Sequence, residues 1–167
     1  MEARIRIGWN KFRQLLPLLT NKDASLITRG RLYSSCVRSS MLPWPVRKEN
    51  VVALQRAEMR MVKWMCRTRI KLKDRFPSKE LRERLGIDDI ALVLQQNRLR
   101  WYGHVLQKED DDWVKKCMEY ETEGPRHRGR PKRTWREVVQ KDCQTRKLNK
   151  EDDMDRSKWR KLIKDVR

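Results

Sequence analysis

The stretch "SKELRERLGIDDIALVLQQNRLRWYGHVLQ", residues 78–107, is typical of two helices separated by a tight turn. Ser78 is suited to cap the first helix, and Gly86 is placed to end it in a left-handed conformation. Asp88 or Asp89 is then expected to cap a longer helix that continues to about Gln107. One side of that helix is expected to carry Ile90, Val93, Leu94, Asn97, Trp101, His104 and Val105.

Apolar residues recur at helical spacing in the rest of the chain as well, and no stretch alternates cleanly enough to indicate a strand. We therefore predict an all-α fold, an irregular array of about six to eight helices with a partly flexible basic linker. Four regions are expected: a helical region at 1–68, a helix–turn–helix-like region at 69–121, a basic Gly/Pro linker at 122–132 and a helical pair at 133–167.

Three helices are expected in the first region. The first is bent near Pro17, because proline removes a backbone donor, and the second spans 25–41 until "MLPWPV" ends it. Asn50 is suited to cap the third, which continues to about Cys66. The expected buried faces are Ile5, Trp9, Phe12, Leu16 and Leu19 in the first helix, and Leu54, Ala57, Met61, Trp64 and Met65 in the third.

Further helices are expected after the acidic run at 110–112, which is suited to capping, and after the basic linker. The last helix is expected to start from Asn149. Core positions in these helices are Trp113, Val114, Cys117 and Met118, then Trp135, Val138, Val139 and Cys143, and finally Trp159, Leu162, Ile163 and Val166. All tryptophans except Trp44 are expected to anchor the core.

The charge balance points to a polyanionic partner. The chain has 42 Lys and Arg against 23 Asp and Glu, a formal charge of +19. Such an imbalance repels itself unless a polyanion is nearby, so nucleic acid is the expected partner. Neither a long apolar span nor a signal-peptide pattern is visible, so we expect a nuclear or cytoplasmic protein that is not secreted and has no membrane partner. We also expect no small-molecule substrate.

Catalytic interpretations find little support in the sequence. Paired aspartates such as Asp88 and Asp89 hold metal ions in polymerases, but here they follow a glycine stop and precede a helix, which favours capping. A zinc site would have to combine His104, Cys117, His127 and Cys143, whose spacing is unlike that of compact zinc modules. We expect no enzyme, no metal and no cofactor.

The segment "GPRHRGRPKRTW", residues 124–135, concentrates basic residues between glycines and prolines. An AT-hook-like contact, a solvated linker and a nuclear import signal are all compatible with it. The candidate phosphate contacts are Arg98, Arg100, Arg126, Arg128, Arg130, Lys132, Arg133 and Arg136. The candidate stacking residues are Trp101, Tyr102 and His104, although His104 is expected mainly to pack on the apolar face of its helix.

Four phrases together resemble one family: "RGRLYSSCVRSSML" at 29–42, "LQRAEMRMVKWMC" at 54–66, "NRLRWYGHVLQ" at 97–107 and "GPRHRGRPKRTWREVVQKD" at 124–142. They look like the C-terminal end of endonuclease–reverse transcriptase polyproteins of LINE-type, non-LTR retrotransposons. The resemblance implies a thumb-like region at 1–68 followed by a basic tail, both of which contact nucleic acid in that family. It covers nearly the whole chain.

The sequence departs from that family in two ways. It contains neither the nuclease nor the aromatic-x-Asp-Asp motif of the polymerase palm, and after Leu42 it continues directly with "PWPVRKEN", where the family has a further short segment. The hypothesis is therefore a non-catalytic nucleic-acid-binding fragment of a retrotransposon reverse transcriptase. The alternatives are a decayed open reading frame without selected function and a helical protein-interaction module.

Overall fold

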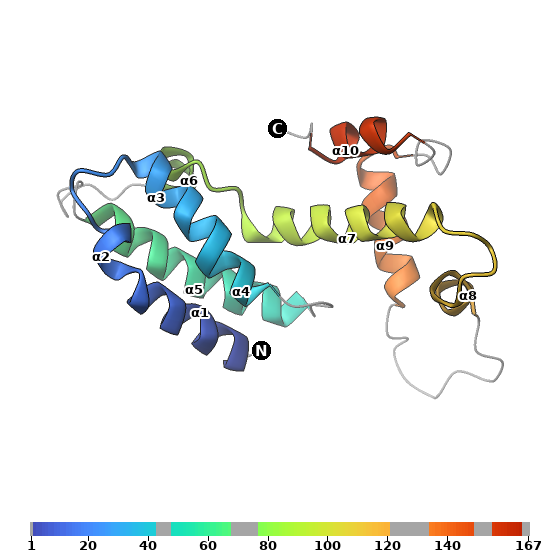
Figure 1. Cartoon of the computed structure of the whole chain (residues 1–167), viewed down its shortest axis with the longest axis horizontal. Coiled ribbons are helices and arrows are strands. Elements are labelled where there is room, and N and C mark those ends of the chain that lie inside the picture. Colours follow the sequence, from blue (N-terminus) through green and yellow to red (C-terminus); the bar gives the residue numbers. More distant parts are fainter. Residues whose placement is uncertain (1, 43–47, 68–76, 121–133, 149–154, 165–167) are drawn as a thin grey trace. The chain divides into compact units, whose positions relative to one another are not determined.

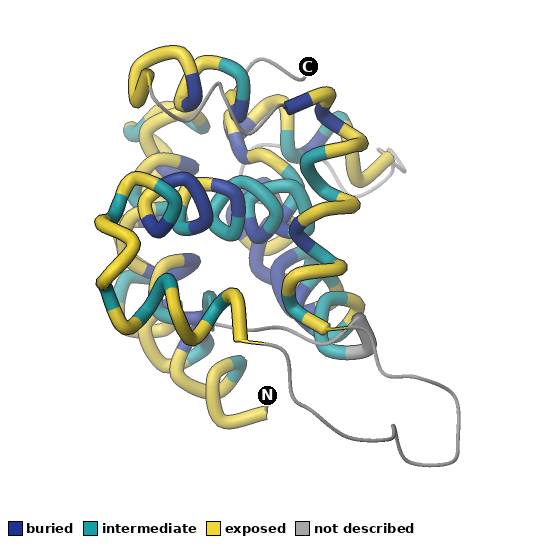
Figure 2. The backbone as a smooth tube through the Cα atoms, turned by 90° about the vertical axis from the view of Figure 1, so that its right-hand side faces the viewer, coloured by how far each residue is buried: buried dark blue, intermediate teal, exposed yellow. Residues whose placement is uncertain are grey.

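A computed structural model describes residues 2–42, 48–67, 77–120, 134–148 and 155–164 (Figure 1). Within these ranges every regular element is a helix and no strand occurs, which confirms the predicted all-α class. Buried and exposed positions alternate along the helices (Figure 2). No helix in the described ranges combines the length and the apolar character needed to cross a membrane.

The chain divides into two units, Met1–Val93 and Leu94–Arg167, so that helix α7 (Ile90–Leu106) begins in the first and continues into the second. This grouping differs from the expected regions 1–68 and 69–121. The difference arises because α6 (Ser78–Leu85) packs against α3 (Leu26–Leu32) and α5 (Lys48–Arg67), which joins the first half of the helix–turn–helix stretch to the first unit.

The first unit begins with α1 (Glu2–Gln14) and α2 (Leu16–Leu19), separated at Leu15, two residues before Pro17, which confirms the predicted interruption. The predicted helix at 25–41 is present as α3, a π-helical segment η1 (Tyr33–Arg38) and α4 (Ser39–Met41). Ser25 caps it, because its hydroxyl accepts a hydrogen bond from the Thr28 amide at 3.1 Å.

Two expectations for α5 were wrong. The helix begins at Lys48, so Asn50 lies within its first turn and is not the cap. Leu54, Met61 and Met65 are fully buried as expected, but the Trp64 side chain is 44% exposed at the edge of the core.

The turn between α6 and α7 follows the sequence closely. Gly86 ends α6 with φ 63° and ψ 36°, the predicted left-handed conformation that other residues rarely adopt. Asp89 caps α7, since its carboxylate accepts a hydrogen bond from the Ala91 amide at 2.8 Å. Ser78, however, is the first residue of α6 and Pro77 occupies the cap position, so the predicted Ser78 cap was wrong by one residue.

The second unit continues from α7 into α8 (Trp113–Glu119), α9 (Trp135–Thr145) and α10 (Arg156–Lys164). Asp112 caps α8 as predicted, with its carboxylate 2.8 Å from the Val114 amide nitrogen. The expected burial of Trp113 was wrong, because this side chain is 73% exposed. The predicted start at Asn149 lies outside the described residues, and the described part of the last helix is capped by Asp155.

Trp159 anchors the core of the second unit. Its ring packs against α7 at Gly103, where an added Cβ would lie 2.3 Å from the ring nitrogen. That nitrogen donates a hydrogen bond to the Leu99 carbonyl at 3.1 Å, so the indole is both buried and satisfied. The cluster comprises Leu99, Tyr102, Val139, Leu148, Trp159 and Ile163.

Candidate nucleic-acid interface

Arg98 forms an ion pair inside the second unit. Its Nε and one terminal nitrogen donate hydrogen bonds to an oxygen of Asp142 on α9 at 3.0 and 2.8 Å, and both side chains are largely covered. Asp142 also accepts from Gln95 at 3.1 Å. A two-point ion pair of this kind fixes α9 against α7, so Arg98 acts here as a positioning residue.

The three candidate stacking residues lie in different environments. Tyr102 is buried in the core cluster, and Trp101 is half-buried, edge-to-face with Trp135 at a ring separation of 5.0 Å. The expectation that His104 packs on the apolar face was wrong, because His104 is exposed. The buried side of α7 passes instead through Leu99, Tyr102 and Gly103.

Arg100 and His104 nevertheless share a stripe on the outside of α7. Together with Asn97 and Trp101 they follow the spacing i, i+3, i+4 and i+7, which places them along one side of a helix. Arg100 is exposed and donates a hydrogen bond to Asn97 at 3.2 Å. This stripe keeps two polar groups at the surface beside a partly accessible indole.

The predicted linker contacts Arg126, Arg128, Arg130, Lys132 and Arg133 lie outside the described residues. Arg136, the last predicted contact, is exposed in the first turn of α9. Thr134 caps this helix through a 3.3 Å hydrogen bond from the Glu137 amide, so the chain passes directly from the basic segment into an ordered helix.

The sequence interpretation missed the basic face of α10. This helix, "RSKWRKLIK", buries Trp159 and Ile163 on one side and contains no acidic residue. Its cations, all exposed, are Arg156, Lys158, Arg160, Lys161 and Lys164. Because the apolar residues follow the spacing i, i+3 and i+4, the cations occupy the remaining surface. The spacing of Trp159, Leu162 and Ile163 among the cations carries that signal in the sequence.

Positive charge around α8 is locally neutralised. Lys108, Lys115 and Lys116 form ion pairs with Asp112, Asp110 and Asp111 at 2.7, 2.5 and 2.7 Å. Two of these carboxylates, those of Asp110 and Asp111, are 95% exposed. The acidic run therefore offsets the basic residues beside it, and α8 contributes less to the attraction of a polyanion than α10 does.

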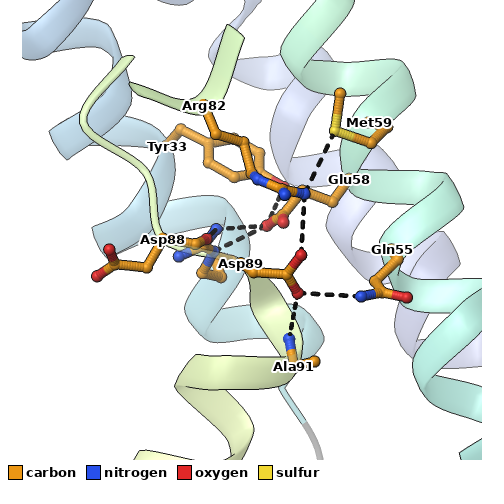
Figure 3. A network of polar contacts seen from close by, with 9 residues as sticks. Tyr33, Gln55, Glu58, Met59, Arg82, Asp88, Asp89 and Ala91 are labelled. Carbon is orange, nitrogen blue, oxygen red and sulfur yellow. Dashed lines mark hydrogen bonds and ion pairs between the residues drawn. The ribbon is translucent and has the colours of Figure 1, made fainter. Parts of the chain in front are cut away.

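Asp89 has a structural role in the first unit, as Figure 3 shows. Its carboxylate accepts from Gln55 at 3.0 Å and from the Ala91 amide, and it pairs with Arg82 at 3.0 Å. Burial alone would raise the pKa of Asp89, but these hydrogen bonds and the arginine charge lower it below its ordinary value. This confirms the capping role for Asp89, one of the two aspartates expected to cap the helix.

A buried ion pair lies beside this network. Arg38 Nε donates to Glu58 at 2.8 Å, and the Tyr33 hydroxyl approaches the same carboxylate oxygen at 3.5 Å. Burial raises the pKa of Glu58, although Arg38 opposes that shift. A terminal nitrogen of Arg38 also donates to the Asp88 carbonyl at 2.5 Å, so Arg38 connects η1, α5 and the turn before α7.

The cysteines in the two cores are poorly suited to nucleophilic chemistry at neutral pH. Burial raises the pKa of the Cys143 thiol to about 11 and also raises the pKa of Cys66. Among the described residues, no group of three or more His, Cys, Asp or Glu side chains is arranged to hold a metal ion. His127, which the zinc alternative requires, lies outside them.

Comparisons with protein-family models, with curated proteins and with solved structures find no match. Function is therefore inferred from the charge, burial and packing of this chain's own residues, together with the sequence phrases quoted above.

Proposed function

We propose that this chain is a non-catalytic nucleic-acid-binding protein that contacts the phosphate backbone through basic helices and its Arg-rich segment. The observation that carries the proposal is the basic face of α10, with five exposed cations in a nine-residue helix. Because the core cluster holds the apolar side of α10 through Trp159, the cations are displayed on a fixed helix. A fixed array of cations suits a phosphate backbone.

Two other helices of the second unit support this assignment. Arg100 and His104 are exposed on α7, and Arg136 is exposed on α9. The overall charge of +19 adds a long-range attraction that speeds encounter with a polyanion. We further propose, from the four phrases quoted above, that the chain derives from a retrotransposon reverse transcriptase and works in the nucleus or cytoplasm.

The test is the salt dependence of binding to a labelled duplex. If about six phosphates are neutralised, log K should fall against log salt with a slope of roughly −5. Replacing Arg160, Lys161 and Lys164 with glutamine should make that slope shallower by about 3 and leave the helical circular dichroism unchanged. A flat salt response, or an α10 variant with an unaltered slope, would contradict the proposal.

A helical protein-interaction module is the second candidate, and exposed aromatic side chains at the two ends of α8 favour it. Trp113 is the first residue of the helix and Tyr120 is the cap residue after its last turn, and each is 73% exposed. Exposed aromatic residues are enriched in protein interfaces. If this candidate is correct, Trp113→Ser with Tyr120→Ser should abolish capture of a protein partner but leave nucleic-acid affinity intact.

The decayed-reading-frame alternative makes a different prediction about folding. A chain without selected structure would lose helix gradually on heating, whereas packed units with satisfied buried groups unfold cooperatively. Thermal melting followed by circular dichroism, together with dispersion of the amide resonances, distinguishes these outcomes.

A further inference from the structure

The first unit presents an aromatic seam where α1 meets α5. The ring centroids of Trp9 and Trp64 are 6.4 Å apart, and both rings pack against the buried ring of Phe12, at 5.6 and 5.8 Å. Trp64 is 44% exposed and Trp9 is half-buried. Two indoles therefore remain accessible at the surface, held in place by a core residue beneath them.

Cations border this seam on the α5 side. Arg56, Arg60 and Lys63 are exposed and follow the spacing i, i+4 and i+7, so they form one stripe about 10 Å long. At about 100° per residue, Arg60 lies roughly 40° around the helix from Trp64, on the side away from buried Met61. The stripe therefore runs along the solvent side of the exposed indole.

The α1 side has the same arrangement. Arg6 and Arg13 are exposed and one heptad apart, and both lie within about 60° of Trp9 around the helix, on the side away from buried Phe12. Cations thus stand on both sides of the tryptophan pair, five in all: Arg6, Arg13, Arg56, Arg60 and Lys63.

Acidic groups do not neutralise this surface within the described part of the chain. None of the five cations forms an ion pair there. Glu58 of α5 is buried on the other side of the helix, where it pairs with Arg38. The seam differs in this respect from α8, where aspartates form ion pairs with the neighbouring lysines.

We propose that this seam is a separate binding site for unpaired nucleic acid, in which a base stacks on Trp64 and the five cations hold the flanking phosphates. Cationic grooves with accessible aromatic rings suit single strands, because an unpaired base offers a ring face that a duplex conceals. The proposal shares nucleic acid as ligand with the function proposed for α10. It differs in its unit, its residues and its preferred substrate.

The experiment compares two variants of the full chain that each remove three positive charges. One replaces Arg56, Arg60 and Lys63 with glutamine, and the other replaces Arg160, Lys161 and Lys164. Each is titrated by fluorescence anisotropy against a labelled oligouridylate and against a labelled duplex. We expect the α5 variant to lose at least tenfold more affinity for the single strand than for the duplex, with a single-strand salt slope shallower by about 2.

The outcomes separate the two proposals. Equal losses for both ligands in both variants would show that only bulk charge matters and would overturn the seam site. An unaltered single-strand affinity in the α5 variant would overturn it as well. If instead the α10 variant keeps its duplex affinity while the α5 variant selectively loses single-strand affinity, the function proposed for α10 fails and the seam site stands.

Trp64 provides a test of stacking. Trp64→Phe keeps a flat ring and should retain single-strand affinity within a few-fold, whereas Trp64→Leu should lose about tenfold, as expected when one base loses its aromatic platform. Circular dichroism melting checks that both variants fold. Equal affinity of the two variants would overturn the stacking assignment. Preference of the unaltered chain for phosphatidylserine vesicles over the oligonucleotide would assign the surface to lipid and overturn the proposal.

Discussion

Two buried arginines, one from each unit, have different kinds of partner. In the first unit Arg38 pairs with the buried carboxylate of Glu58. In the second unit the buried Arg146 donates to the neutral Gln95 side chain and the Ile163 carbonyl. Both arginines count toward the formal charge, yet neither is displayed on the surface. The number of basic residues therefore overstates the charge offered to a partner, and the partners of each buried arginine set the consequence of removing it.

The largest effect is expected for Arg38→Met. This change leaves the buried Glu58 carboxylate without its partner, and breaking a buried pair in this way costs about 3–5 kcal/mol of unfolding free energy. Arg146→Met leaves only neutral acceptors without a donor and should cost about 1–3 kcal/mol of unfolding free energy. Urea denaturation followed by circular dichroism measures the losses, and hydrogen exchange assigns each to its unit.

A double variant tests the cause. Arg38→Met combined with Glu58→Leu removes both charges and should recover most of the stability, because a well-packed apolar pair can replace a buried ion pair. If the double variant is as unstable as Arg38→Met, the loss reflects packing around Arg38 and the contrast between the two arginines is wrong.

Gly103→Ala should destabilise the second unit alone. The new Cβ would lie 2.3 Å from the Trp159 ring nitrogen, so α10 has to shift, which costs about 1–3 kcal/mol of unfolding free energy. The better helix propensity of alanine offsets up to about 1 kcal/mol of that loss. The same substitution in a Trp159→Phe background should cost less, because the smaller ring leaves room. Additive losses in that cycle would contradict the clash.

Local signals predicted much of the fold. The glycine stop at Gly86, the caps at Asp89 and Asp112 and the burial of Trp159 follow from backbone geometry and helical periodicity, which a short stretch of sequence contains. The cap expected at Asn50 failed because α5 extends further toward its N-terminus than the capping signal indicates.

The candidate site was harder to predict, because exposure depends on partners distant in sequence. Arg98 and Arg100 look equivalent in "NRLRW", yet of the two only Arg98 forms an ion pair with Asp142, which lies on another helix. Tyr102 and His104 were both candidate stacking residues, but α9 and α10 cover the buried side of α7 and leave His104 outside. Periodicity gives the angular position of a side chain, whereas tertiary packing decides which sides are covered.

Acid should weaken the first unit through Asp89. Since its folded pKa is lowered, Asp89 contributes stability above its ordinary pKa of 3.8, and that contribution is lost as the pH falls through the lowered value. Asp89→Asn keeps a good helix cap but lacks this titration, so the stability difference from the unaltered chain should shrink below about pH 4. Urea titrations at several pH values measure it, and a difference independent of pH would contradict the assignment.

The contribution of Glu58 to stability changes with pH in the opposite direction. Because burial raises its folded pKa, its contribution to stability is lost as the pH rises above its ordinary value of 4.5. Comparing the unaltered chain with Asp89→Asn at each pH cancels the part of this term that comes from burial, since both proteins retain Glu58, and leaves the smaller part that comes from the Asp89 charge. The difference between the two proteins, not the slope of either curve alone, therefore reports on Asp89.

The smallest change in stability is expected at α8, where neutralisation happens at the surface. Asp110→Asn with Asp111→Asn breaks two ion pairs whose carboxylates are 95% exposed, so stability should hardly change. The formal charge rises by two, from +19, and nucleic-acid affinity should increase a few-fold at low salt. Anisotropy titrations at low salt and near 1 M salt measure this gain, which should vanish at high salt, where the screening length is only about 3 Å. A gain that persists at high salt would mean that the aspartates obstruct a direct contact, and that α8 belongs to the interface.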